Sequence, residues 1–319
     1  MSNSGRSINT LRQTLALLFL LLPVAANADT RLPGPVQIAP HTWAWIGPYG
    51  PPTRDNGGFR MNLGFVVGRD TVAVIDSGYG TVMAGAMLEQ IGRLTNRPVE
   101  YVINTNSQPH RVLGNAIFKK EGAHIIAASE AVARTVANGA LMASTAEEIL
   151  GAAPGSIPPP GAPDRELHQT SQLDLGGVTL NLIPVGTAHT AGSLIVEIVE
   201  DQVVFTGDVL YGGRLLAILP VSRVDGWIAA FDGLREFGDV LFVPGHGEAG
   251  KLVDFEHPTY NYLTALKSHM DEAVEQGDDM QDAIDGMDQR GWRQLADFDA
   301  LAGRNAHQAY LEREEAAFE

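Results

Sequence analysis

The sequence has 319 residues, a formal net charge of −16 and no cysteine. Its length suits one large domain or two small ones, and a chain this acidic is poorly suited to bind nucleic acid or anionic lipid, both of which attract clustered Lys and Arg. Without cysteine, the chain can form neither disulfide bonds nor thiolate metal sites, so any metal ligands must be His, Asp, Glu or amide side chains.

The first 28 residues are predicted to be an export signal that lies outside the fold. Arg6 and Arg12 give it a basic start, LALLFLLLPV is a short apolar core, and Ala26-Asn27-Ala28 fits the small-x-small rule for cleavage. The apolar core is shorter than the ~20 residues that cross a bilayer. We therefore expect cleavage after Ala28 and a periplasmic or secreted mature chain without a membrane span. Its formal charge would be −18, because two arginines are removed from a total of −16.

The first half of the chain alternates strands with helices. Runs rich in β-branched and aromatic residues, bounded by turn residues, predict strands. These strands are expected at 41–47, 61–68, 71–78, 99–105 and 124–129. The helical spacing of Met83, Met87 and Ile91 predicts a helix at 81–96, and a second helix is expected at 130–141.

The second half repeats this organisation after a segment rich in Pro and Gly. That segment, AAPGSIPPPGAPD at 152–164, cannot lie inside a helix and is expected to bridge two halves of the domain. Strands are predicted at 170–185, 193–208 and 240–247, and a helix at 224–238. From 257 to 319 the pattern is helical and amphipathic. We interpret the chain as an α/β fold with two face-to-face sheets, helices outside them, and a C-terminal helical cap.

Metal-competent side chains follow the predicted strands. Asp76 follows TVAVI, His110 lies in the loop after VEYVI, and His189 lies after LNLIPV. Asp208 ends VVFTGD, and His246 ends LFVPGHG. Strand ends hold functional groups rigidly while the loops beside them stay accessible. We therefore expect these side chains to gather at one rim of the two sheets.

Five motifs, in their order along roughly residues 60–250, resemble the metallo-β-lactamase superfamily of hydrolases. They are VAVIDSG, NTNSQPHRVLGN, TAHTAGS, FTGD and PGHG. The stretch RNAHQAYLE (304–312) and the export signal are most similar to exported zinc metallohydrolases of quinoprotein relay systems. The resemblance implies an αββα sandwich with one or two metal ions, usually zinc, at the edge of the sheets. From the pattern along the chain we expect one domain over 29–256, with 257–319 as its helical cap.

One motif departs from the family pattern, which is His-x-His-x-Asp-His, two residues, and Gly-Asn or Gly-Gly. Aligned on its Gly-Asn pair, this chain has Asn106 and Gln108 in the first two His positions, His110 in the Asp position and Arg111 in the last His position. All four ligand positions differ, whereas the surrounding residues fit the related exported enzymes.

These substitutions change the chemistry of the site. Asn106 and Gln108 offer only weak amide oxygens, and Arg111 is always protonated and has no lone pair for a metal. We therefore predict that the Arg111 guanidinium partly replaces the second metal ion and pairs with Asp208, which bridges the two metals in the family. A guanidinium more than about 6 Å from Asp208 would exclude this pairing.

His110, His189, Asp208 and His246 remain as metal ligands. They suffice for one zinc or other divalent ion, with three ligands bound and one position open, so one ion is expected rather than two. Such an ion would hydrolyse an ester, a thioester or an amide of a small-molecule substrate. Asp76 would orient loop backbone or a ligand imidazole, and His110 is an alternative proton shuttle.

Other interpretations stay open from the sequence. A chain that lost its ligands while keeping the fold would bind no metal and act as an accessory or binding protein, and a metal carrier is a third possibility. Asp76 equally suits an Asx-type turn. Tyr211 and Arg214, which follow Asp208, could line a substrate pocket, but we expect them at the surface. The sequence does not indicate the substrate, a protein partner or the oligomeric state.

Overall fold

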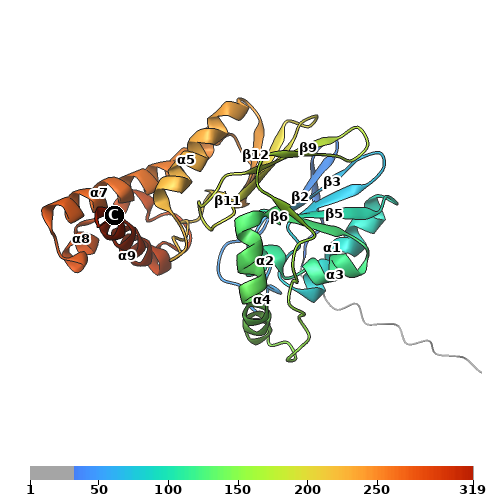
Figure 1. The fold of residues 1–319 in the computed structure, drawn as a ribbon, viewed down its shortest axis with the longest axis horizontal. Helices are drawn as coiled ribbons and strands as arrows, with labels where there is room; N and C mark the ends of the chain where they lie inside the picture. The colour runs from blue at the N-terminus through green and yellow to red at the C-terminus, as the bar shows by residue number, and fades with distance from the viewer. Residues whose placement is uncertain (1–31, 319) are drawn as a thin grey trace, which may run out of the picture.

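The computed structural model describes residues 32–318, and two β-sheets form its centre. The predicted export signal at 1–28 lies outside the described residues. The larger sheet has the order β1-β2-β3-β4-β5-β6-β7, and the smaller has the order β12-β11-β10-β9-β8. Figure 1 shows α1, α3 and α4 on one side of the strands, with α5 and the C-terminal helices on the other.

The larger sheet is built from the first half of the chain. Its strands are β1 (Val36–Ala39), β2 (Thr42–Trp45), β3 (Leu63–Val67), β4 (Val72–Ile75), β5 (Val99–Asn104), β6 (His124–Ala128) and β7 (Arg165–Leu167). The pairs from β1 to β4 are antiparallel, and those from β4 to β7 are parallel. Parallel neighbours need long crossovers, and helices provide them.

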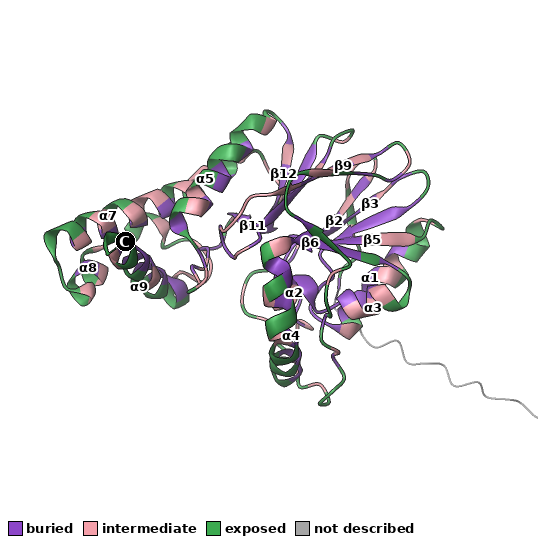
Figure 2. Ribbon diagram, viewed as in Figure 1, coloured by how far each residue is buried: buried purple, intermediate pink, exposed green. Residues whose placement is uncertain are grey.

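The smaller sheet is built from the second half. Its strands are β8 (Ser171–Asp174), β9 (Thr179–Pro184), β10 (Leu194–Ile198), β11 (Val203–Tyr211) and β12 (Leu241–His246). The pairs from β8 to β11 are antiparallel, and β11 runs parallel to β12. Every residue of β11 is buried, so this strand is the centre of the molecule rather than an edge (Figure 2).

Helices cover the outer faces of both sheets. On the first sheet lie α1 (Thr81–Leu94), α2 (Pro109–Val112), α3 (Asn115–Lys120) and α4 (Ser129–Leu150). Beside the second lie α5 (Val224–Leu234), a 3₁₀ turn (Arg235–Phe237), α6 (Leu252–Phe255) and a π-helical segment (Glu256–Asn261). The chain ends with α7 (Tyr262–Gln276), α8 (Met280–Gly286), a 3₁₀ turn (Arg290–Trp292) and α9 (Phe298–Ala317).

The hydrophobic core has three main parts, which define the layers. One cluster lies between the sheets and joins Val66 and Ile103 of the first to Leu180 and Phe205 of the second. A second cluster packs α1 and its neighbours on the first sheet, and a third packs α5 and the C-terminal helices on the second. The α/β sandwich with outer helices that the sequence predicts is therefore confirmed.

Polar as well as apolar contacts hold the C-terminal helices against the second half of the sandwich. The Glu312 carboxylate of α9 accepts hydrogen bonds from the Val224 amide at 2.9 Å, where α5 begins. Asn305 accepts from the Ile218 amide and donates to the Leu216 carbonyl, both at 2.8 Å. Both residues belong to the RNAHQAYLE stretch, which therefore fixes the loop at 216–218. None of the described helices is long and apolar enough to cross a membrane.

The segment rich in Pro and Gly leads from α4 into β7, so it is not the place where the chain passes from one sheet to the other. After 152–164 the chain forms β7, which pairs in parallel with β6 of the first sheet. The change of sheet comes later, at 168–170, between β7 and β8. A strand of three residues is too short to produce a periodic signal, so the sequence did not reveal it.

Candidate metal centre

The predicted site residues meet at one rim of the sandwich because four neighbouring strands end or bend there. Asp76 follows β4, and the segment 105–114 follows β5 in the same sheet. Asp208 lies in β11 and His246 ends β12 of the other sheet. The Asn62 amide group bridges the rim by donating to the carbonyls of residues 244 and 247, at 2.9 and 2.7 Å.

Three side chains form a group that could hold a metal ion. His110, Asp208 and His246 each offer a ligand atom, and these atoms all lie within 4.8 Å of one another. Nε2 of His110 is 3.4 Å from Asp208 Oδ2, and Nε2 of His246 is 3.3 Å from Asp208 Oδ1. The carboxylate therefore lies between two imidazoles that approach different oxygen atoms.

The tautomer of His246 follows from its other contact. Nδ1 of His246 is 2.8 Å from the Arg60 carbonyl oxygen, which can only accept, so Nδ1 carries the proton of the neutral ring. Burial lowers the pKa of His246 to about 4, so the ring is neutral at neutral pH. The Nε2 lone pair then faces an oxygen of Asp208. Two lone pairs at this separation repel unless a cation lies between them, which fits a divalent ion.

The Nε2 atom of His110 also lacks a hydrogen-bond partner. Its Nε2 is buried and makes no hydrogen bond of good geometry, since the 3.4 Å approach to Asp208 is long. Burial lowers the pKa of His110 to about 3. The imidazole is therefore neutral and has the lone pair that a metal ligand needs.

His189 lies on the wall of the same cavity but outside this group of three. Its ring is buried, with ring centroids 5.0 Å from Trp227 and 5.9 Å from Tyr211. Neither ring nitrogen makes a hydrogen bond of good geometry, although the Ala217 carbonyl lies close enough to favour the charged ring. Burial nevertheless lowers the pKa of His189 to about 4. Its role as a metal ligand stays a prediction.

The predicted pairing of Arg111 with Asp208 is confirmed. The Arg111 side chain is 1% exposed, with Nη2 2.7 Å from Asp208 Oδ1 and Nε 3.3 Å from Oδ2. Nη1 donates to the Asn62 carbonyl at 2.7 Å and to Asp76 at 3.0 Å, and Nη2 also donates to the Gly245 carbonyl at 3.1 Å. All five N–H groups of the guanidinium therefore have acceptors inside the protein.

These contacts keep the Asp208 carboxylate ionised. Burial opposes its ionisation, but the Arg111 guanidinium keeps the pKa of Asp208 well below its usual range. The Asn106 side-chain amide also donates to Asp208 Oδ2 at 2.7 Å. Asp208 Oδ1 therefore accepts from Arg111 and faces His246, whereas Oδ2 accepts from Asn106 and faces His110.

Asp76 orients the loop and the guanidinium. It accepts from the amide and the hydroxyl of Thr105, both at 2.7 Å, and from Arg111. Its φ of 61° is left-handed, an uncommon backbone conformation for a residue other than glycine. Burial raises the pKa of Asp76 to about 6, against Arg111, which lowers it. The interpretation that Asp76 positions loop backbone agrees with these contacts, whereas a catalytic role stays a prediction.

The altered ligand positions Asn106 and Gln108 differ in what they contact. The Asn106 amide nitrogen faces Asp208, and its oxygen accepts from the Gln108 backbone amide at 2.8 Å. That oxygen is therefore engaged by the loop itself and not presented to a metal. Gln108 precedes the short α2 helix and lines the cavity near His110.

Steric and hydrogen-bond constraints account for the residues around the four ligand positions, namely Asn104, Gly114 and Asn115. A Cβ on Gly114 would come within 2.0 Å of the Ser77 carbonyl oxygen, so only glycine fits. Asn104 and Asn115 exchange side-chain hydrogen bonds at 3.1 and 2.7 Å, and Asn104 also donates to the Arg111 carbonyl. These residues hold the loop whichever side chains occupy the four ligand positions.

A cavity of about 250 Å³ opens beside the group of three. Tyr211 and Arg214 line it and are 1% and 6% exposed, so their predicted surface placement is wrong. The C-terminal segment covers them, because Leu215 and Gly213 exchange backbone hydrogen bonds with Ala296. Arg60 also lines the cavity, and nothing in its Pro- and Gly-rich loop marked it in the sequence.

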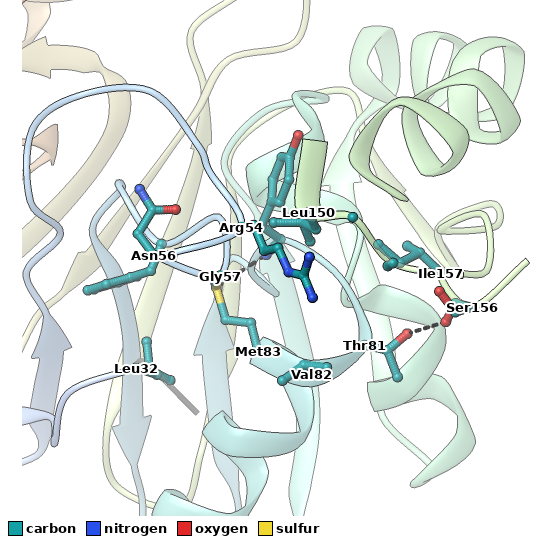
Figure 3. Close-up of a pocket in the computed structure, with 14 residues that line it drawn as sticks. Leu32, Arg54, Asn56, Gly57, Thr81, Val82, Met83, Leu150, Ser156 and Ile157 are labelled. Atoms are coloured by element: carbon teal, nitrogen blue, oxygen red, sulfur yellow. Dashed lines mark hydrogen bonds between the residues drawn. The ribbon is translucent and has the colours of Figure 1, made fainter. Parts of the chain in front are cut away.

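A second and larger cavity, of about 670 Å³, holds none of the predicted site residues. Figure 3 shows its lining, which comes from the loop at 54–59, the start of α1 and the segment after α4. Its walls are mostly apolar, with Met83, Leu150 and Ile157 among them. Size therefore does not single out the candidate site, whereas the convergence of imidazoles and a carboxylate does.

Comparisons with known proteins agree on the fold. The family model of the metallo-beta-lactamase superfamily matches residues 57–246. Among solved structures, the chain is similar to a metallo-beta-lactamase from Pontibacter korlensis (19% identity, TM-score 0.56, covering 72% of this chain and 98% of that one). It is also similar to the DIM-1 metallo-beta-lactamase (13% identity, TM-score 0.57, covering 72% and 96%).

One curated relative matches over a shorter stretch. It is the acyl-coenzyme A thioesterase MBLAC2 of Gallus gallus, 32% identical over 92 residues, which are 28% of this chain. The match spans about a third of the length of that relative, 33%.

Proposed function

Because the chain belongs to the metallo-β-lactamase superfamily, we propose that it is an exported hydrolase that cleaves an ester, thioester or amide with a single divalent metal ion. The observation that carries the proposal is the convergence of His110, Asp208 and His246 within 4.8 Å beside a cavity. Two neutral imidazoles and a carboxylate form a donor set that suits zinc with one position left open.

Charge supports one ion rather than two. Asp76 and Asp208 carry two negative charges, and Arg111 carries one positive charge, so the three groups sum to −1. One divalent ion would balance the remaining charge of these carboxylates. A second ion would add to the positive charge of Arg60 and Arg214 on the cavity wall, and it would have to share the Asp208 carboxylate that the Arg111 guanidinium already engages. An ion held by His110, Asp208 and His246 would supply Lewis-acid chemistry, lowering the pKa of water and polarising a carbonyl group.

The remaining residues of the site prepare it for that chemistry. Arg111 fixes both oxygens of Asp208, and the Arg60 carbonyl fixes the tautomer of His246. The Tyr211 ring lies against His246 with its centroid 5.1 Å away and restricts rotation of the imidazole. The His110 side chain is 13% exposed, against 3% for His246, and it serves as a ligand or carries a proton to the leaving group.

A thioester is the bond class that we favour among the three. The curated relative is an acyl-coenzyme A thioesterase, and it matches this chain at 32% identity over 92 residues. Export rests on the signal predicted for residues 1–28. Detection of the full-length chain in the cytoplasmic fraction alone, with its first 28 residues intact, would contradict export.

The decisive experiment measures metal content and turnover of the purified mature chain, residues 29–319. Elemental analysis is expected to give one divalent ion per chain, and a panel of an acyl thioester, an acyl ester and nitrocefin is expected to show hydrolysis of at least the thioester. His246→Ala should abolish both. His168→Ala removes an exposed histidine and serves as the matched control, which should retain both.

A non-catalytic accessory protein is the second candidate, and one observation favours it. Both oxygens of Asp208 already receive close donors, from Arg111 and Asn106, so the carboxylate is satisfied without an ion. A folded mature chain with neither stoichiometric metal nor turnover of any substrate in the panel would support this candidate and contradict the hydrolase.

A further inference from the structure

The cavity beside the candidate metal centre carries an excess of positive charge. Three arginines line it, namely Arg60, Arg214 and Arg304, in a chain whose formal net charge is −16. Arg304 is exposed on α9, and it makes no ion pair with any other residue in the described range 32–318. An acidic protein repels anions at long range, so cations gathered at one cavity mark a local preference for negative charge.

Two of these arginines share one carboxylate. Arg214 donates through Nε to Asp297, whereas the nearest guanidinium nitrogen of Arg60 lies 3.9 Å from the same carboxylate oxygen. Asp297 can neutralise only one of the two charges. The second guanidinium is therefore left without a counter-charge of its own.

Arg60 is the one without a proper partner. Its side chain is 15% exposed, and its Nε is buried with no hydrogen-bond partner. A buried N–H group without an acceptor is costly, and an anion in the cavity would supply one.

The Arg214–Asp297 pair has a structural role that does not account for Arg60. Arg214 pairs through its backbone with Ala296, and this contact tethers the C-terminal segment across the cavity. Its guanidinium also lies 5.9 Å from the centroid of the Tyr211 ring. This tether involves Arg214 and not Arg60, so the Arg60 guanidinium remains available to a ligand.

From this arrangement we propose that Arg60 and Arg214 form a subsite for a carboxylate of the substrate, beside the bond that is cleaved. Two planar guanidinium groups match the geometry of a carboxylate. Arg60 places the subsite next to the candidate metal centre, because its own carbonyl holds His246. The small cavity favours a short acyl group that ends in a carboxylate. The inference rests on the proposed hydrolase function and names the substrate class for the same site.

A matched pair of substrates tests the subsite. The butanoyl and succinyl thioesters of N-acetylcysteamine have the same leaving group and differ mainly in a terminal carboxylate. The kcat/KM of the succinyl thioester should exceed that of the butanoyl thioester by at least about tenfold, as expected for hydrogen bonds to a charged group. Arg60→Gln and Arg214→Gln should each move this ratio towards one.

Because the ratio compares two substrates on the same variant, a smaller amount of folded enzyme lowers both rates equally and leaves the ratio unchanged. Arg97→Gln removes an exposed arginine between α1 and β5, and it should leave the ratio unchanged. A ratio near one in the natural protein, or a ratio that survives both cavity substitutions, would overturn the subsite while leaving the proposed hydrolase intact.

Binding separates the two proposals if neither thioester is hydrolysed. Calorimetric titration of succinate should show binding to the natural chain and to Arg97→Gln, with at least about tenfold weaker binding to Arg60→Gln. That result would keep the subsite and reject the hydrolase. Absence of succinate binding, or binding of inorganic phosphate in its place, would overturn the assignment of a carboxylate.

Discussion

The two sides of Asp208 differ in how their electrostatic requirements are met. On one side the Arg111 guanidinium fills the space, and each of its N–H groups has an acceptor. On the other side the Nε2 atoms of His110 and His246, both in neutral rings, lie 3.4 and 3.3 Å from the carboxylate. We call these the guanidinium side and the imidazole side.

The two sides differ in the kind of cation that suits them, because the Arg111 guanidinium is covalently attached to the chain whereas a metal ion exchanges with solvent. A guanidinium cannot be lost to a chelator, needs no entry path and positions the carboxylate permanently. It cannot, however, act as a Lewis acid on water. The guanidinium side therefore suits structure, and the imidazole side is where metal chemistry would take place.

Removing the metal should have the largest effect on function and little on the fold. Treatment of the mature chain with a chelator is expected to abolish turnover, whereas a single cooperative unfolding transition should persist, because Arg111 continues to hold Asp208. Turnover and circular dichroism melts on the same sample measure both. Unfolding on chelation would show that the guanidinium side does not maintain the site.

Removing the guanidinium should have the opposite effect. Arg111→Met leaves two buried carboxylates without their cation and should lower the free energy of unfolding by about 3–5 kcal/mol. Urea denaturation measures the change. Arg69→Met removes an exposed arginine whose side chain is 73% accessible, and it should cost less than about 1 kcal/mol. Equal losses in the two variants would contradict the structural role of Arg111.

Restoring the family ligands should convert the guanidinium side into a second metal position. The quadruple variant Asn106→His, Gln108→His, His110→Asp and Arg111→His places the family pattern on an unchanged frame. Metal content is expected to rise from one to two ions per chain. The same variant with Asp208→Asn is the control and should bind fewer ions. A quadruple variant that still binds one ion or none would show that more than the ligands has changed.

The larger cavity should be the least sensitive region. Val82→Ser changes an exposed side chain on its wall, 61% accessible, and should alter the free energy of unfolding by less than about 0.5 kcal/mol. The kcat/KM for the thioester is expected to stay unchanged. A large loss of turnover would show that this cavity takes part in substrate binding and that the comparison between the two sides of Asp208 is incomplete.

Much of the candidate site was predictable because its signals are local. Asp76 and His110 come after buried strands, His246 ends one and Asp208 lies near the end of another, and strand ends meet at one rim of a sandwich. The pairing of Arg111 with Asp208 also followed from the sequence, because a buried guanidinium requires a carboxylate and the motif order brought these two together.

Other features depend on contacts that no local pattern encodes. His189 follows its strand as the others do, yet the rings of Tyr211 and Trp227 hold it outside the group of three. Tyr211 and Arg214 are buried only because the chain returns at Ala296 to cover them.

By itself, the sequence located most of the strand-forming segments, the substituted ligand loop and the acidic and imidazole groups, although the runs at 170–185 and 193–208 each contain two strands. These depend on residue type and alternation over a few positions. Only the tertiary structure decided where the chain changes sheet, which imidazoles share the carboxylate, and that Arg60 and Arg214 share Asp297. The reason is that burial and charge compensation at those places come from segments that are distant along the chain, and the packed fold alone brings them together.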